Sequence, residues 1–173
     1  PQTGALISIA MTGSVPRDGF ITRSGSRPGD WIAVTGRLGG SFESGRHLTF
    51  HPRLPEGRWL AALPPHLRPT AMMDISDGLS QDLPRLADAS GVPGFDIDFE
   101  QVPVNEDSDL RSALGEGEDY ELLFTVSSGA REELANRWKD AFPDTRLTFI
   151  GKMEEENERS ILEGGWEHFR SGN

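Results

Sequence analysis

Short apolar runs recur along the chain and predict β-strands. Residues 5–11 (ALISIAM) are rich in apolar and β-branched side chains, a composition typical of a buried strand. Between residues 95 and 99, phenylalanine and isoleucine alternate with aspartate, which is the period-two pattern of a half-buried strand. Further apolar runs predict strands at residues 30–35, 71–75, 120–126, 146–150 and 160–162.

An amphipathic helix is predicted directly after the strand at residues 71–75. It ends near Ser90, where Gly91 is a helix stop signal. Pro84 removes one backbone donor, so this helix either begins late, near Ser80, or is kinked. Apolar residues on one side of the helix predict that it packs on a sheet. They are Leu79, Leu83, Leu86 and Ala87.

A second amphipathic helix is predicted over residues 130–142, with Leu134, Trp138 and Ala141 facing inward. A shorter helix at residues 105–114 would begin at Asn105 as its cap. Breaks rich in proline, glycine and polar residues separate these elements. They leave a brief helix at residues 56–63 and loops at residues 12–29 and 36–41.

The order of these elements favours an α+β fold. Strands and helices alternate irregularly, and some predicted strands follow one another directly. This pattern favours a mixed β-sheet with helices packed on it over a doubly wound parallel sheet. The 173 residues show no internal repeat and no boundary, so we expect residues 1–173 to form one domain. The absence of cysteine excludes disulfides and thiolate zinc sites.

The chain is strongly acidic, with 17 basic and 28 acidic residues and a formal net charge of −11. Such a surface repels nucleic acid, so no nucleic-acid partner is expected. It also repels bare ATP, so a phosphate ligand would need divalent cations to bridge it to carboxylates. The sequence predicts neither a signal peptide nor a membrane span, because no apolar run approaches the ~20 residues that a span needs. We therefore expect a cytoplasmic protein.

Two aspartates lie where an apolar strand meets a helix start, in residues 74–78 (DISDG). Asp74 and Asp77 are close enough to face one ligand, and two carboxylates suit Mg²⁺ together with substrate phosphates and water. Ser76 can donate a hydrogen bond to a phosphate oxygen, and Gly78 permits a close approach or an unusual φ. In the alternative interpretation, Ser76 or Asp77 caps the helix and Asp74 lies at the surface.

A second acidic segment leads into the strand at residues 120–126. Its acids are Glu116, Glu118 and Asp119, and they follow a flexible glycine turn. Carboxylates at a strand entrance can bind metal, or can accept hydrogen bonds from an amine or a cationic ring. The alternative is a charged turn at the sheet margin, with Tyr120 as an amphipathic edge residue.

Two further features carry weaker indications of ligand binding. Trp166 follows two glycines near the C-terminus and can stack on a planar ligand, although such a tryptophan more often fastens a tail to the body. The glycine-rich turn at residues 39–41 can approach a phosphate. It lacks the lysine of a P-loop and the spacing of a dinucleotide fingerprint, so a tight turn is the simpler interpretation.

Together, these motifs resemble the C-terminal domain of the thiamine-monophosphate kinase family, within the superfamily of aminoimidazole ribonucleotide synthetase. The resemblance runs along nearly the whole chain, from ISIAMTG through DWIAVTG and MMDISDGLSQDL to GEDYELLFTV and GGWEHF. The pair DISDG and GEDYEL, in that order and separation, is specific. Relatives in the superfamily have different residues at the DISDG position.

The resemblance implies a three-layer α/β/α domain with a mixed β-sheet flanked by helices. It also implies direct transfer of the ATP γ-phosphoryl group to thiamine monophosphate, which gives thiamine diphosphate, with Mg²⁺ as cofactor and without a covalent enzyme intermediate. Positions that match the family motifs receive their roles from it. They are Asp74 and Asp77 for Mg²⁺, Ser76 for ATP, and Glu118 and Trp166 for the substrate. Gly78 and Asp119, in the same two motifs, are candidate supporting residues.

Two departures from the family pattern matter. Glu116 stands where many members have the first of two glycines, so the loop differs in charge. The family's N-terminal domain, which supplies most nucleotide and Mg²⁺ ligands and builds a homodimer, is absent from this sequence. We therefore expect residues 1–173 to be the C-terminal domain of a longer protein, which keeps its fold but turns over little alone. The alternatives are another ATP-dependent enzyme of the superfamily and a non-catalytic metal–phosphate binding module.

Overall fold

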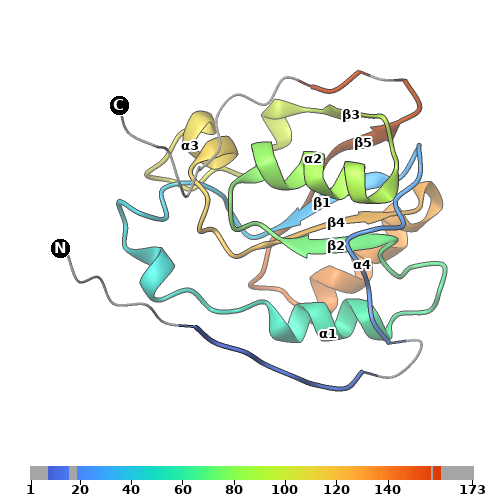
Figure 1. Cartoon of the computed structure of the whole chain (residues 1–173), viewed down its shortest axis with the longest axis horizontal. Helices are drawn as coiled ribbons and strands as arrows, with labels where there is room; N and C mark the ends of the chain where they lie inside the picture. The colour runs from blue at the N-terminus through green and yellow to red at the C-terminus, as the bar shows by residue number, and fades with distance from the viewer. Residues whose placement is uncertain (1–7, 16–18, 157, 161–173) are drawn as a thin grey trace.

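The computed structural model describes residues 8–15, 19–156 and 158–160. Five strands form one sheet in the order β2-β4-β1-β5-β3 (Figure 1). The strands are β1 (Trp31–Thr35), β2 (Ala71–Asp74), β3 (Gly94–Ile97), β4 (Leu122–Val126) and β5 (Leu147–Glu154). The α-helices are α1 (Leu54–Ala62), α2 (Leu79–Ser90), α3 (Leu110–Gly115) and α4 (Arg131–Ala141). Three short 3₁₀ turns are η1 (Arg46–Leu48), η2 (Phe99–Gln101) and η3 (Ser128–Ala130).

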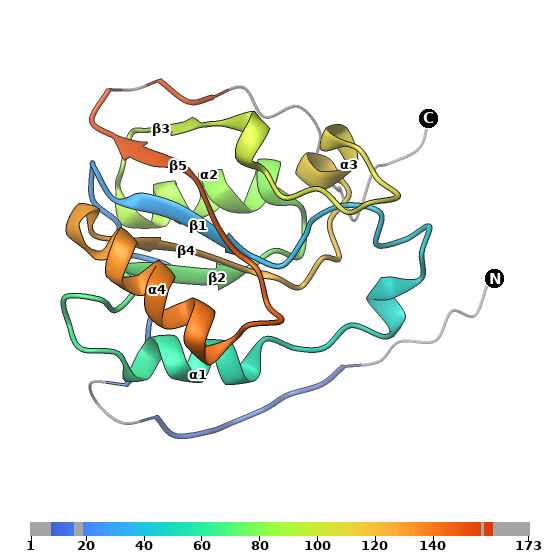
Figure 2. The ribbon, with the colours of Figure 1, turned by 180° about the vertical axis from the view of Figure 1, so that it is seen from behind.

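The helices cover both faces of the sheet. On one face, buried side chains of α2 and α3 pack against β1, β2, β3 and β5 in one apolar cluster. On the other face, α1 and α4 form a second cluster in which Leu60 and Trp138 join Phe124 of β4. Figure 1 is viewed from the α2 side, and Figure 2 brings α4 forward. The predicted α+β class and its three layers are confirmed.

The sheet is antiparallel at every strand pair among the described residues, rather than mixed as predicted. In the described part of the chain, parallel pairing is limited to two isolated bridges, Leu38 with Val104 and Phe95 with Arg159. The first three strands do run in one direction, joined by connections that contain α1 and α2. However, β4 and β5 insert between them in the opposite direction, so no two parallel strands are neighbours. Pairing between distant segments decides this, and the local pattern does not specify it.

The N-terminal strand prediction is wrong for its described part. Residues 8–11 form no strand, and Ile9 and Met11 are 81% and 90% exposed. Residues 5–7 lie outside the described residues. Figure 1 shows this segment as an extended blue trace outside the three layers. An apolar run becomes a strand only when a sheet edge is available to pair with it, and this segment pairs with none in the described part of the chain.

Helix α2 follows the prediction closely. It begins at Leu79 and continues through Pro84 to Ser90, and Gly91 ends it with a left-handed φ of 69°. The lost backbone donor of Pro84 is tolerated because Leu83 and its apolar neighbours are fully buried against the sheet. Among the described residues, no helix has the length and apolar character needed to span a bilayer.

Helix α3 begins later than the prediction for residues 105–114. Asp109 is its N-cap, and the Asp109 carboxylate accepts a hydrogen bond of 2.8 Å from the Ser112 N–H. The predicted cap, Asn105, instead donates its side-chain N–H to the Gly39 carbonyl at 2.6 Å. A long-range contact has therefore taken the residue that local sequence assigned to the helix.

Smaller differences occur at the ends of other elements. Leu134 and Trp138 of α4 are buried as predicted, whereas Ala141 is exposed. Strand β3 ends at Ile97, because Phe99 begins the η2 turn. Ser160 lies in no named strand, and residues 161–162 of that predicted strand lie outside the described residues. The predicted strands at residues 30–35, 71–75, 120–126 and 146–150 correspond to β1, β2, β4 and β5.

Candidate functional site

The two acidic motifs meet at one end of the sheet. Strands β1 and β2 end there, and β4 begins there, because β4 is antiparallel to both. Asp74 pairs with Leu122 at the start of β4. The Leu122 N–H donates a hydrogen bond of 2.8 Å to the Thr35 hydroxyl at the end of β1. The sheet topology therefore brings together three loops that are far apart in the sequence.

Main-chain hydrogen bonds continue the β2–β4 pairing beyond the strands. The Ile75 N–H donates to the Glu121 carbonyl, and the Tyr120 N–H donates to the Ile75 carbonyl, both at 2.8 Å. The Glu118 N–H donates to the Ser76 carbonyl, also at 2.8 Å. The DISDG segment (residues 74–78) and the GEGED segment (residues 115–119) are thus held together through their backbones, which leaves their side chains available for other contacts.

Backbone proximity explains the glycines of both segments. Gly78 has a φ of 99°, and a Cβ atom there would lie 2.9 Å from the Leu114 carbonyl oxygen. Gly117 has a φ of 74°, and a Cβ atom there would lie 2.7 Å from the Ser76 carbonyl oxygen. Both positions combine a left-handed conformation with a close backbone approach, so glycine is required. The prediction for Gly78 agrees with this geometry.

Two non-glycine residues of the second motif have left-handed backbones. Glu118 has a φ of 57° and Tyr120 a φ of 54°. Such conformations cost about 1–3 kcal/mol each and persist only where surrounding contacts hold them, often at functional sites. The Tyr120 hydroxyl donates a hydrogen bond of 2.8 Å to Glu118 Oε2. The αL turns therefore bring both side chains to the same part of the site.

Tyr120 lies among the acids of the site. Burial, first, and the Glu118 carboxylate raise the pKa of Tyr120 to about 12, and the negative charges of Asp74 and Asp77 raise it further. These three carboxylates therefore act electrostatically on one phenol.

The two predicted metal ligands differ in their surroundings. Asp74 is exposed at the end of β2, and its carboxylate makes no hydrogen bond or ion pair among the described residues. Asp77 is partly buried and forms an ion pair with Arg85 of α2. Ser76 is half-buried. Its main chain is hydrogen-bonded on both sides, to Asp82 and to Glu118.

Asp82, which the sequence reasoning missed, holds the turn before α2. Its buried carboxylate accepts hydrogen bonds from the Ser76 and Asp77 N–H groups at 3.0 and 2.9 Å. Burial raises the pKa of Asp82, against the effect of these backbone donors and of Arg85. Gly78 is the N-cap residue of α2 and, as a glycine, offers no side-chain cap bond. The only available sequence signal was an acid in the first helical turn.

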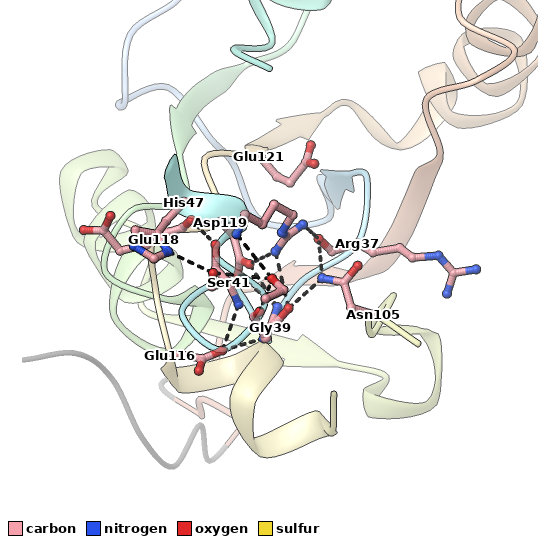
Figure 3. Close-up of polar contacts among 12 residues, drawn as sticks. Arg37, Gly39, Ser41, His47, Asn105, Glu116, Glu118, Asp119 and Glu121 are labelled. Atoms are coloured by element: carbon pink, nitrogen blue, oxygen red, sulfur yellow. Dashed lines mark hydrogen bonds and ion pairs between the residues drawn. The ribbon is translucent and has the colours of Figure 1, made fainter. Parts of the chain in front are cut away.

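The glycine turn after β1 binds two acids of the second motif. Asp119 is buried. Its carboxylate accepts a hydrogen bond of 3.0 Å from the Gly39 N–H and forms an ion pair with Arg46. Glu116 accepts hydrogen bonds from the N–H groups of Gly40 and Ser41. Figure 3 shows Glu116 and Asp119 directed toward this turn, whereas the Glu118 carboxylate points away from it.

Asp119 is a structural acid with an unusual protonation equilibrium. Burial, above all, raises the pKa of Asp119 to about 7, although the Arg46 charge and the Gly39 N–H oppose this. Its role as a supporting residue therefore consists of fixing the glycine turn from within the protein. The N–H groups of this turn are not available to a phosphate, because carboxylates of the same chain already accept hydrogen bonds from them.

An ion pair between Arg53 and Glu121, which the sequence did not reveal, stabilises the end of the second acidic segment. The Glu121 carboxylate accepts two hydrogen bonds of 2.7 Å from the Arg53 guanidinium and one of 2.6 Å from the Thr35 hydroxyl. Glu56 binds the same guanidinium. This bidentate pair ties the start of β4 to the residues before α1.

The remaining predicted residue, Trp166, lies outside the described residues. Within the described ranges, no three His, Cys, Asp or Glu side chains are grouped so that they form a metal site alone. Asp74 and Asp77 nonetheless offer hard carboxylate oxygens, and Mg²⁺ typically uses one or two carboxylates with phosphate and water. By donor chemistry, these two side chains are of the kind that Mg²⁺ binds when a phosphate ligand completes its coordination.

The sequence matches the family described as AIR synthase related protein, C-terminal domain, over residues 27–162. It is 34% identical to a thiamine-monophosphate kinase of Aquifex aeolicus over 193 aligned positions, which cover 94% of this chain and 58% of that protein. The chain therefore spans little more than half the length of this relative.

Solved structures give the same result. A thiamine-monophosphate kinase from Stenotrophomonas maltophilia K279a superposes with a TM-score of 0.71 and 26% identity, over 88% of this chain and 56% of that one. The structure described as AaThiL complexed with AMPPCP and TMP gives a TM-score of 0.68 and 29% identity, over 87% and 54%. The resemblance to thiamine-monophosphate kinases is confirmed. Since the family match covers residues 27–162, the chain belongs to the family of AIR synthase-related C-terminal domains.

Proposed function

We propose that this chain forms part of an enzyme that transfers the ATP γ-phosphoryl group to thiamine monophosphate and so produces thiamine diphosphate. The observation that carries the proposal is the backbone pairing of the DISDG and GEGED segments, which holds the loop that carries Asp74 and Asp77 against the loop that carries Glu118. Relatives at about 34% identity are named as kinases of this substrate. One related structure is named as a complex with AMPPCP and TMP, which supports a site for a nucleoside triphosphate and a second phosphate ligand.

Asp74 and Asp77 are the residues that would hold Mg²⁺. When bound, the ion would neutralise phosphate charge in a site that is otherwise strongly anionic. Asp74 is accessible without rearrangement. Asp77 already has a cationic partner in Arg85, and Arg85 keeps a second contact of 2.9 Å with Asp82. If Asp77 binds an incoming cation, Arg85 therefore keeps its ion pair with Asp82.

The other residues of the site orient the reactants. The Ser76 hydroxyl makes no hydrogen bond among the described residues and is half-exposed, so it can donate to a phosphate oxygen of ATP. Glu118 offers a carboxylate that can accept from the amino group, or attract the cationic thiazolium ring, of thiamine monophosphate. No side chain needs to act as a covalent nucleophile, because positioning and charge neutralisation account for phosphoryl transfer of this kind.

The complete protein is proposed to be longer than residues 1–173. The relatives are longer than this chain, which leaves room for an N-terminal domain that would supply further nucleotide and Mg²⁺ ligands and form a homodimer. Residues 1–173 alone would then fold but turn over slowly or not at all. ATP and Mg²⁺ as reactants suit a cytoplasmic location, and the acidic chain suits no nucleic-acid role.

The test is an ADP-release assay on the complete protein with Mg²⁺ and ATP. ADP release that depends on thiamine monophosphate, with thiamine diphosphate as product, is the expected result. Thiamine and an unrelated phosphate monoester serve as control substrates and should give no release. ADP release only with a different phosphate or carboxylate substrate would assign the protein to another activity of the superfamily.

A further inference from the structure

The strongest feature that the proposed function leaves unexplained is Tyr120, the only tyrosine of the sequence. Its backbone is fixed, because its N–H donates to the Ile75 carbonyl at 2.8 Å and its φ of 54° is left-handed. A tyrosine pays a conformational cost here that a glycine would avoid. The contacts of the Tyr120 side chain must therefore offset this conformational cost.

The ring of Tyr120 is held from the side by Phe50. The two rings are stacked, with 4.2 Å between their centroids and 22° between their planes. Phe50 comes from the loop between η1 and α1, which is far from Tyr120 in the sequence. Such a stack restricts the rotation of the phenol and so fixes the direction of its hydroxyl group.

The fixed hydroxyl group acts on one carboxylate. It donates a hydrogen bond of 2.8 Å to Glu118 Oε2. The Glu118 main chain is held as well, because its carbonyl accepts from the Ser41 hydroxyl at 2.7 Å and its N–H donates to Ser76. Glu118 Oε1 accepts no hydrogen bond among the described residues. One carboxylate oxygen is therefore oriented by the protein, and the other is available to a ligand.

We propose that Tyr120, stacked on Phe50, is a positioning residue that orients the Glu118 carboxylate toward the amino or cationic ring portion of the substrate. This inference rests on the proposed function for the identity of the substrate. The Tyr120 hydroxyl would hold Glu118 before the ligand arrives, so that less rotational freedom is lost on binding. It would thus contribute to affinity for thiamine monophosphate and leave the transfer step itself unchanged.

Tyr120→Phe keeps the ring stack and removes only the hydroxyl group. In the complete protein, we expect KM for thiamine monophosphate to rise about tenfold, because a hydrogen bond to a charged group is lost. The kcat and the KM for ATP should change less than about twofold, since uniform substrate binding is affected. Ser127→Ala removes the hydroxyl group just before η3, which donates a hydrogen bond to the His66 carbonyl, and it is the matched control. An unchanged KM for thiamine monophosphate, or an equal rise for ATP, would overturn the inference.

A double-mutant cycle separates positioning from a merely structural role. If Tyr120 acts through Glu118, then Tyr120→Phe should raise KM no further in a Glu118→Ala background. A second rise of about tenfold in that background would show that Tyr120 acts on the substrate or the fold by another route.

A third measurement decides the contact without any activity. ¹³Cζ-tyrosine spectra of the complete protein and of its Tyr120→Phe variant should differ by one resonance, so the ionisation of Tyr120 can be followed directly. Burial and Glu118 raise the pKa of Tyr120 to about 12, so the wild-type phenol should remain mostly protonated at about pH 11. Glu118→Gln should lower this pKa more than Asp74→Asn does. Equal shifts would refute the Tyr120–Glu118 contact even if the protein proves to have a different substrate, whereas missing kinase activity alone would refute only the proposed function.

Discussion

At the scale of single residues, the acids of the site have two different tasks. Asp82, Glu116 and Asp119 accept hydrogen bonds from main-chain N–H groups and fix the loops. Asp74 and Glu118 each keep at least one carboxylate oxygen that no described residue binds. A cluster of like charges is tolerated here because backbone donors and the guanidinium groups of arginines compensate the first group. The second group is then available to a cation or a cationic ligand.

The protonation of Asp119 leads to a testable dependence of stability on pH. Its folded-state pKa of about 7 lies above the ordinary value of 3.8, so the folded protein binds this proton more tightly than the unfolded chain. The contribution of Asp119 to stability is therefore complete below about pH 4 and is lost as the pH rises through about 7. The upper limit of the effect is roughly 4 kcal/mol, at about 1.4 kcal/mol per pKa unit.

Asp119→Asn should flatten this dependence, because the amide cannot ionise. Thermal unfolding between about pH 5 and pH 8 should show a smaller fall of Tm in the variant than in the wild type. Asp140→Asn, which changes an exposed acid on α4, is the control and should leave the slope unchanged. Parallel curves for Asp119→Asn and wild type would mean that Arg46 keeps Asp119 ionised throughout.

At the scale of elements, the site depends on two loops that extend the β2–β4 pairing. The sheet order places β4 between β1 and β2, so the start of β4 meets the ends of both. Three main-chain hydrogen bonds then join residues 75–76 to residues 118–121. The approach is close enough that one methyl group on the wrong residue would separate the loops.

Gly117→Ala tests this close approach. The new Cβ atom would lie 2.7 Å from the Ser76 carbonyl oxygen, and the φ of 74° disfavours alanine as well. We expect a loss of about 1–3 kcal/mol in the free energy of unfolding, measured with urea, together with reduced kinase activity. Gly129→Ala is matched to it, because nothing lies within 4 Å of a Cβ atom there and its φ is not left-handed. Similar losses for both variants would contradict the proposed role of the Gly117 contact.

Most helices and strands could be predicted from the sequence, but the strand directions could not. The helix α2 and the strands β1, β2, β4 and β5 follow from apolar periodicity, because each buries its apolar side on a neighbouring layer. The strand directions could not be derived, since β4 and β5 pair with segments far away in the chain. Residues 8–11 were predicted as a strand from composition alone and have no sheet partner in the described part of the chain.

The limits were similar within the site. The two acidic motifs were found because each adjoins a strand end, and their contact follows from the sheet. Asp82 and the Glu121–Arg53 pair were missed, because their partners come from residues that no local pattern connects. Sequence spacing therefore located the loops, and tertiary contacts decided which acids are structural.

At the scale of the whole molecule, the described domain presents half of a proposed phosphoryl-transfer site. It supplies two aspartates, a serine and a glutamate, and no group of three acids that would hold a metal alone within the described residues. The ligand phosphates and a further domain would have to complete the coordination. The central claim is therefore that Asp74 and Asp77 bind the Mg²⁺ ion. The alternative is that Asp74 is an ordinary surface charge and that Asp77 only pairs with Arg85 of α2.

The most direct measurement of that claim is the rate of thiamine diphosphate formation by the complete protein with Asp74→Asn or Asp77→Asn. Each variant should lose roughly 10²–10³-fold in kcat/KM, because it removes a charge that stabilises the transferring phosphoryl group through Mg²⁺. Unchanged circular dichroism would show that the loss is chemical, and Asp140→Asn should retain full activity. Near-wild-type rates in both folded aspartate variants would contradict the assignment of this site to phosphoryl transfer.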